Sequence, residues 1–79
     1  MPIKLLFFGS TAAVTKMREY ELPFPGPMTA LQVLDLVSIM FPGLGSLRLQ
    51  IAINQQHASY DDTVRDGDEL AIFSAVSGG

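Results

Sequence analysis

A single segment of this chain, residues 30–41, has the apolar periodicity of a long amphipathic helix. The apolar side chains that would share one face are Ala30, Val33, Leu34, Val37, Met40 and Phe41. Thr29 precedes the segment as an N-cap candidate, and Pro42-Gly43 ends it. Ile39 would lie nearly opposite the apolar face, where single exposed apolar residues are common. A chain of 79 residues with one long helix must build the rest of its core from strands.

Two strands are predicted before the helix. Ile3–Phe8 is apolar at both alternating sets of positions except Lys4, which predicts a central strand with both faces at least partly covered. Met17–Leu22 alternates and is expected to pair with the first strand as a hairpin. Between them, Thr11–Thr15 fits a loop or a short helical turn. Pro23–Pro27 is expected to be an extended connector, because its three prolines and one glycine exclude regular structure.

Further strands are predicted after the helix. Leu47–Ile53 alternates cleanly and is followed by a polar turn at residues 54–56. His57–Tyr60 fits a short strand. Asp61–Asp68 is expected to be a loop that closes with an Asp-Gly turn, in which glycine supplies a positive φ. Glu69–Ser74 is the last predicted strand.

The order of these elements is β-β-α-β-(β)-β, which predicts an α+β fold of the β-grasp, ubiquitin-like type. In this arrangement the first and last strands are adjacent and parallel at the centre of a mixed sheet. The sheet would have four to five strands, with the one main helix on one face. We therefore interpret residues 1–74 as one β-grasp domain.

One helix can cover only one face of such a sheet. The residues expected to face the helix are Ile3, Leu5, Phe7, Leu70 and Ile72. The alternation then places Leu6, Phe8 and Phe73 on the uncovered face. Two phenylalanines in one exposed cluster are typical of a protein-docking surface. The alternative is partial cover of this face by the proline-rich connector or by the loop at residues 54–68.

The last predicted strand is followed directly by Ala75, Val76, Ser77, Gly78 and Gly79. The two glycines have no Cβ, so a carboxylate carried on them can enter a channel too narrow for side chains. We interpret residues 75–79 as a flexible tail with a function, and the alternative is a frayed terminus.

A carboxylate on Gly79 has a route to sulfur chemistry. It is a poor electrophile, but an ATP-using partner can activate it as an acyl-adenylate. A sulfur nucleophile can then displace AMP and leave a thiocarboxylate. The chain contains no cysteine, and this route needs none.

No other group of residues predicts an active site. His57 is the only imidazole and has no partner for acid–base chemistry, so a surface position is expected. The acidic residues of 61–69 lack the spacing of an EF-hand loop. Gly43-Leu44-Gly45 does not follow a strand, as a phosphate loop would. We expect no catalytic residue, no metal site and no bound cofactor within this chain.

The charges favour partners other than nucleic acid or membrane. The net charge is −3, and the basic residues are scattered along the sequence as Lys4, Lys16, Arg18, Arg48 and Arg65. No segment approaches the roughly 20 apolar residues that cross a bilayer. The apolar start is too short for the core of a signal peptide. A cytoplasmic location is therefore expected.

Four segments carry a resemblance to a known family. They are Ile3-Lys4-Leu5-Leu6-Phe7-Phe8-Gly9, Ala52-Ile53-Asn54-Gln55, Asp66-Gly67-Asp68-Glu69-Leu70-Ala71-Ile72-Phe73 and Val76-Ser77-Gly78-Gly79. With them the chain resembles the small subunits of molybdopterin synthase, the MoaD-type sulfur carriers of the ubiquitin-like β-grasp superfamily. Length and element order match throughout. The chain departs from the usual family pattern at Thr11-Ala12-Ala13-Val14 and at Ser74-Ala75, where Arg-Glu-Leu and Pro-Pro are common.

The resemblance implies a function for the tail and for the uncovered face. Gly79 would be adenylated by a MoeB-type, E1-like enzyme that uses ATP, and then converted to a thiocarboxylate. The tail would enter the active site of a MoaE-type large subunit and donate sulfur to a cyclic pyranopterin precursor. Leu6, Phe8 and Phe73 would face this partner.

Other functions are compatible with the same sequence. One is a sulfur carrier for thiamin or thiometabolite synthesis, since Ala52-Ile53-Asn54-Gln55-Gln56 is also similar to the thiamin carriers. Another is a ubiquitin-like protein modifier joined to lysines through Gly79. A plain β-grasp interaction module with an incidental ending is the third.

Overall fold

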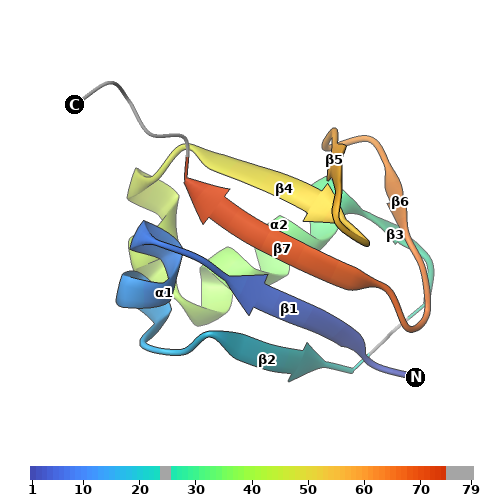
Figure 1. The fold of residues 1–79 in the computed structure, drawn as a ribbon, viewed down its shortest axis with the longest axis horizontal. Coiled ribbons are helices and arrows are strands. Elements are labelled where there is room, and N and C mark those ends of the chain that lie inside the picture. Colours follow the sequence, from blue (N-terminus) through green and yellow to red (C-terminus); the bar gives the residue numbers. More distant parts are fainter. Residues whose placement is uncertain (24–25, 75–79) are drawn as a thin grey trace.

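A mixed five-stranded sheet, crossed on one face by the long helix α2, forms the framework of the protein (Figure 1). The computed structural model of the chain describes residues 1–23 and 26–74. The strands are β1 (Ile3–Phe7), β2 (Glu19–Leu22), β3 (Met28–Thr29), β4 (Leu49–Ile53), β5 (Gln56–Ala58), β6 (Thr63–Val64) and β7 (Glu69–Ser74). The helices are α1 (Ser10–Thr15), α2 (Ala30–Met40) and the 3-10 helix η1 (Pro42–Ser46).

The sheet has the strand order β2-β1-β7-β4-β5. Its central pair, β1 and β7, is parallel, with Leu5 beside Leu70 and Phe7 beside Ile72. The antiparallel strands β2 and β4 flank this pair. The first and last strands are therefore adjacent, parallel and central, and the predicted β-grasp fold is confirmed.

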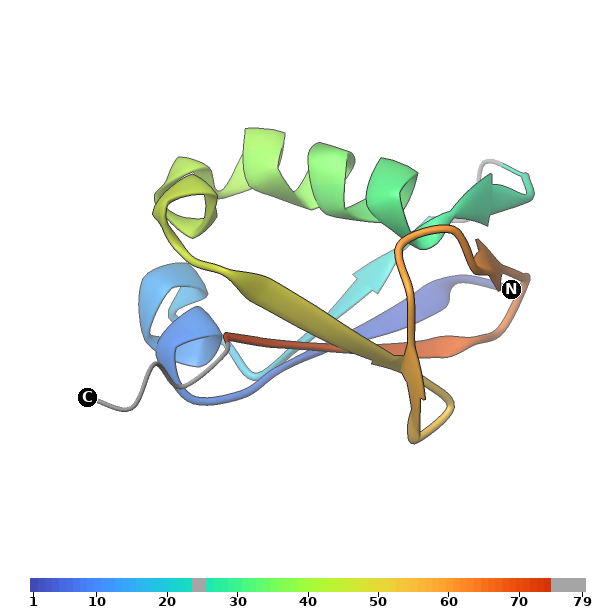
Figure 2. The same ribbon diagram turned by 90° about the horizontal axis from the view of Figure 1, so that it is seen from above.

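Helix α2 packs on one face of the sheet, as Figure 2 shows from above. The predicted N-cap is confirmed, because the Thr29 hydroxyl accepts the Gln32 N–H at 3.2 Å. The Gln32 side chain in turn accepts the Thr29 N–H at 2.9 Å, which completes a capping box. The side chains that α2 buries against the sheet are Ala30, Val33, Leu34 and Val37. Ile39 is 76% exposed, as predicted.

The prediction that Met40 belongs to the buried face of the helix is wrong, because Met40 remains 39% exposed. The helix ends at Met40, and the cap residue Phe41 leaves the helical path. The Phe41 ring lies 6.1 Å from the ring of Phe7 and 6.4 Å from that of Tyr20, in edge-to-face geometry. Phe41 therefore closes the end of the core in place of Met40.

Several strand boundaries differ from the predicted ones by one or two residues. The first strand ends at Phe7, β2 begins at Glu19, and β4 begins at Leu49 because η1 and its cap occupy the residues before it. Asn54 and Gln55 both have positive φ and form a two-residue hairpin turn, so β5 starts at Gln56. The pairing of β3 with β6 forms a second, two-stranded sheet that the sequence did not predict.

The segment after β1, for which a loop or a helical turn was predicted, is the short helix α1. Its buried Thr11 joins three pieces of backbone. The Thr11 hydroxyl oxygen lies 2.8 Å from the carbonyl oxygens of both Phe8 and Ile72, to either of which it can donate. It also accepts the Phe8 N–H at 3.0 Å. Thr11 therefore fastens the end of β1 to β7 and α1.

Replacing Thr11 with valine is expected to lower the free energy of unfolding by about 1 kcal/mol, because a near-isosteric methyl group removes the hydroxyl without opening a large cavity. Chemical denaturation measures this change. Thr63→Val, at an exposed position of β6, is the matched control and is expected to have a much smaller effect. Equal losses in the two variants would contradict a structural role for the Thr11 hydroxyl.

Candidate functional site

The face of the sheet opposite α2 carries no helix in the described part of the chain (Figure 2). Side chains alternate along β1, so the buried residues Ile3, Leu5 and Phe7 point toward the helix and Lys4 and Leu6 point away. The strand register extends this face across the sheet. Leu6 pairs with Glu19 and Ala71, and Ala71 pairs with Ala52.

This open face changes in character along the strands. At the start of β7 it carries charged side chains, with Lys4 beside both Glu21 and Glu69. In the middle it carries Leu6, which lies between Glu19 and Ala71. At the end of β7 it carries Phe73, which pairs with Gln50. The aromatic end of the face is therefore the end at which the predicted tail follows.

Phe8 is the most prominent apolar side chain of this region and is 52% exposed. It separates two shallow hollows. The first is lined by Phe8, Gly9, Ser10, Ala71, Phe73 and Ser74. The second is lined by Leu6, Phe7, Phe8, Gly9, Ala12, Arg18 and Glu19. Leu6, Phe8 and Phe73, the three residues predicted for docking, thus line adjoining hollows. We call this region the apolar docking surface after that prediction, and binding of a partner there stays a prediction.

The backbone explains why Phe8 stays exposed. Gly9 has a φ of +58°, a conformation that side-chain-bearing residues rarely adopt, and it turns the chain from β1 into α1. The Phe8 N–H remains bonded to the Ile72 carbonyl at 3.2 Å. The Phe8 ring is therefore presented on a backbone held by the sheet, and little conformational entropy remains for a partner to remove.

Ser74 lines the same hollow as Phe8 and Phe73, so the docking surface lies where the described chain ends. The predicted tail residues Ala75, Val76, Ser77, Gly78 and Gly79 lie outside the described residues.

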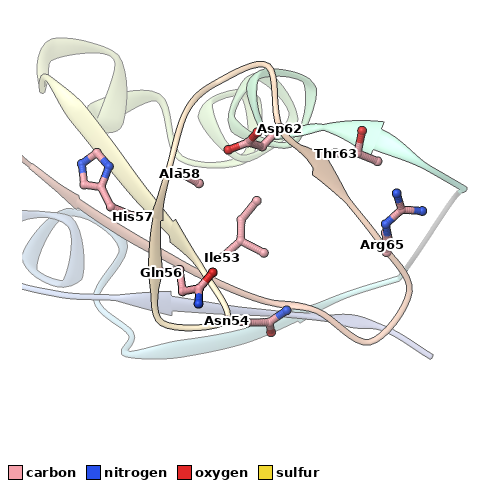
Figure 3. Close-up of a pocket in the computed structure, with 8 residues that line it drawn as sticks. All are labelled: Ile53, Asn54, Gln56, His57, Ala58, Asp62, Thr63 and Arg65. Carbon is pink, nitrogen blue, oxygen red and sulfur yellow. The ribbon is translucent and has the colours of Figure 1, made fainter.

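A second, polar hollow lies between the β4–β5 hairpin and β6 (Figure 3). Two of its polar side chains, those of Asn54 and Asp62, form hydrogen bonds within local turns. Asp62 accepts the Ser59 N–H at 2.9 Å, and the Asn54 amide donates to Asp68 at 3.0 Å. His57 is exposed and lies across the β5 ribbon from Asp62 and Arg65 in Figure 3. This arrangement brings no acid–base pair together.

The acidic loop before β7 forms a turn, as predicted. Gly67 has a φ of +81°, and Asp68 accepts the Arg65 N–H at 2.8 Å. Within residues 1–23 and 26–74, no three histidine, cysteine or acidic side chains are grouped so that they could hold a metal ion. No helix of this described part is long and apolar enough to cross a membrane.

Comparisons with known proteins agree with the fold. The family model named ThiS family matches residues 5–79. The molybdopterin synthase sulfur carrier subunit of Homo sapiens is 30% identical over 82 residues, which cover 98% of this chain and 93% of the relative. The corresponding subunit of Arabidopsis thaliana is 32% identical and covers 98% of this chain and 82% of its own.

Solved structures of similar proteins have the same fold. SAMP1 from Haloferax volcanii superimposes with a TM-score of 0.84 and 26% identity, and each chain is covered completely. A putative molybdopterin converting factor subunit 1 from Pyrococcus furiosus has a TM-score of 0.86 at 17% identity, with 96% of this chain and 99% of that chain covered. The named sulfur carrier subunits confirm the predicted resemblance, and the family model shows that the chain belongs to the ThiS family.

Proposed function

We propose that this protein is the sulfur carrier, and hence the small subunit, of a molybdopterin synthase. The observation that carries this proposal is similarity to named sulfur carrier subunits along 98% of the chain.

The reaction would take place on Gly79, up to which the family model matches. A MoeB-type enzyme would join the Gly79 carboxylate to AMP, with pyrophosphate leaving from ATP. A sulfur nucleophile would then attack the carbonyl carbon and displace AMP, which leaves a thiocarboxylate. The thiocarboxylate would donate its sulfur to a cyclic pyranopterin precursor, and the protein would regain its carboxylate.

The apolar docking surface would bind the large subunit during this transfer. A solved relative from Helicobacter pylori is a complex of subunits 1 and 2 of molybdopterin-converting factor, and its matching chain has 23% identity and a TM-score of 0.64. Burial of Phe8 and Phe73 against a MoaE-type partner would hold the domain while residues 75–79 reach the active site. The folded domain would then bind the large subunit, and Gly79 would carry the reacting group.

A reconstituted transfer assay tests this function. The thiocarboxylated protein, the large subunit encoded in the same genome and the pyranopterin precursor are combined, and molybdopterin is measured by its fluorescent oxidation product. We expect product in proportion to the thiocarboxylate supplied. Thiocarboxylate that remains intact beside an active large subunit would refute the assignment.

SAMP1 is named small archaeal modifier protein 1, and the similarity to it supports a second candidate, a protein modifier attached through Gly79. Both functions would begin with adenylation, but the modifier would form an isopeptide bond with a lysine. Mass spectrometry of cell extracts separates them, since a modifier digested with trypsin, which cleaves after Arg65, leaves residues 66–79 attached to lysines of other proteins. A carrier of the thiamin pathway would instead restore thiazole synthesis in cells that lack their own thiamin carrier.

A further inference from the structure

The basic residues are scattered along the sequence, but the fold gathers three of them at one end of the sheet. Lys16 caps α1, and Arg18 directly precedes β2. The Arg18 carbonyl accepts the Phe7 N–H, which places it at the end of β1. Arg48 precedes Leu49, the partner of Ser74. In Figure 1, α1, the start of β2, the start of β4 and the end of β7 lie at this same end.

Five of the eight acidic residues gather at the opposite end. The loop that leads into β7 and the first residue of that strand hold Asp61, Asp62, Asp66, Asp68 and Glu69. Arg65 is the one basic residue among them. The Lys4 N–H bonds to the Asp68 carbonyl, so this acidic end lies at the beginning of β1. The net charge of −3 therefore conceals a separation of charge along the strands.

The separation is large compared with the range of electrostatic forces. The groups lie at the two ends of β7, whose six residues span about 20 Å, whereas the Debye length is about 8 Å at physiological ionic strength. A partner that approaches the end of β7 is therefore screened from the distant acidic residues. It experiences mainly the local charge of Lys16, Arg18 and Arg48, reduced by that of Glu19, which lines the same hollow as Arg18.

The three cations are exposed and free to pair with a partner. Within the described residues, none of them has a carboxylate within 4.0 Å, and the neighbouring Glu19 carboxylate lies 3.9 Å from Lys4. Arg18 lines the same hollow as Leu6 and Phe8 and therefore borders the apolar docking surface, whereas Arg48 lines a separate hollow with residues of α2 and η1.

We propose that Lys16, Arg18 and Arg48 steer the end of β7 onto an acidic protein rim, which surrounds the pocket that receives residues 75–79. The partner surface would combine an apolar centre, opposite Phe8, with carboxylates around it. Three cations are too few for a polyanion, since nucleic-acid binding proteins commonly neutralise about six to ten phosphates. Steering of this kind raises association rates more than it lowers dissociation rates.

The test measures association rates with the large subunit by stopped flow, and it rests on the proposed function. Arg48→Glu is compared with Arg65→Glu, because both substitutions reverse an exposed arginine at opposite ends of the molecule. We expect Arg48→Glu to slow association at low ionic strength by about threefold or more, and Arg18→Glu with Arg48→Glu by about tenfold. Arg65→Glu should change the rate by less than twofold. The differences should disappear in high salt.

The outcomes separate this proposal from the proposed function. Equal association rates for Arg48→Glu and Arg65→Glu, or faster association of Arg48→Glu, would refute steering while leaving the carrier function intact. Wild-type protein that does not bind the large subunit at all would refute the carrier function and the steering together.

Discussion

Deleting Gly79 is expected to abolish sulfur transfer without changing the stability of the domain. The remaining carboxylate would lie on Gly78. Because one residue of extended chain spans about 3.5 Å, this carboxylate would fall about that distance short of the activating site. Reactions of bound groups lose about two orders of magnitude or more when the reacting atom is displaced by only 1 Å, so this shift should remove activity. The reconstituted transfer assay measures the effect.

The controls for this deletion separate reactivity from folding. The hydrophobic core lies within residues 3–72, so thermal unfolding of the deletion variant should match that of the wild type. Ser77→Ala keeps the length and both glycines, and it should retain most of the activity. Unchanged transfer after deletion of Gly79 would show that the reactive group is elsewhere.

Phe8→Asp is expected to weaken binding to the large subunit by about 30- to 1,000-fold, which corresponds to roughly 2–4 kcal/mol. The Phe8 ring is half exposed beside Phe73 and is held on a sheet-bonded backbone, as an interface anchor requires. Aspartate would remove the apolar contact and leave a charge without a partner at the interface centre. Isothermal titration calorimetry measures the loss of affinity.

Ile39→Asp is the matched control for this substitution. Ile39 is an exposed apolar residue like Phe8, but it lies on the outer face of α2, away from the open face of the sheet. The Ile39→Asp variant should bind the large subunit with the affinity of the wild type. If Ile39→Asp weakens binding as much as Phe8→Asp does, the prediction that the large subunit binds to the open face of the sheet is wrong.

The fold and the docking surface were predictable from sequence because both depend on periodic burial. The helical period of residues 30–41 and the apolar alternation of β1 and β7 fixed which faces meet. That assignment left Leu6, Phe8 and Phe73 on the other side of the sheet, where the structure places them in adjoining hollows. Regular repeats of this kind are local properties of a sequence.

The features that were not predicted depend on contacts between distant segments. The strands β3 and β6 have two residues each, too few to show an alternation. Thr11 is buried because its hydroxyl reaches Ile72, which is 61 positions away. The charge separation has the same origin, since Lys16, Arg18 and Arg48 become neighbours of one sheet end only after the strands pair.

The central claim is that Gly79 carries sulfur as a thiocarboxylate, and intact-protein mass spectrometry tests it most directly. The protein is incubated with the activating enzyme, ATP and a sulfur donor, and its fragments are then sequenced in the spectrometer. We predict a mass increase equal to one oxygen-to-sulfur exchange, localised to Gly79 and absent without ATP. An unchanged mass, or sulfur localised to any other residue, would contradict the claim.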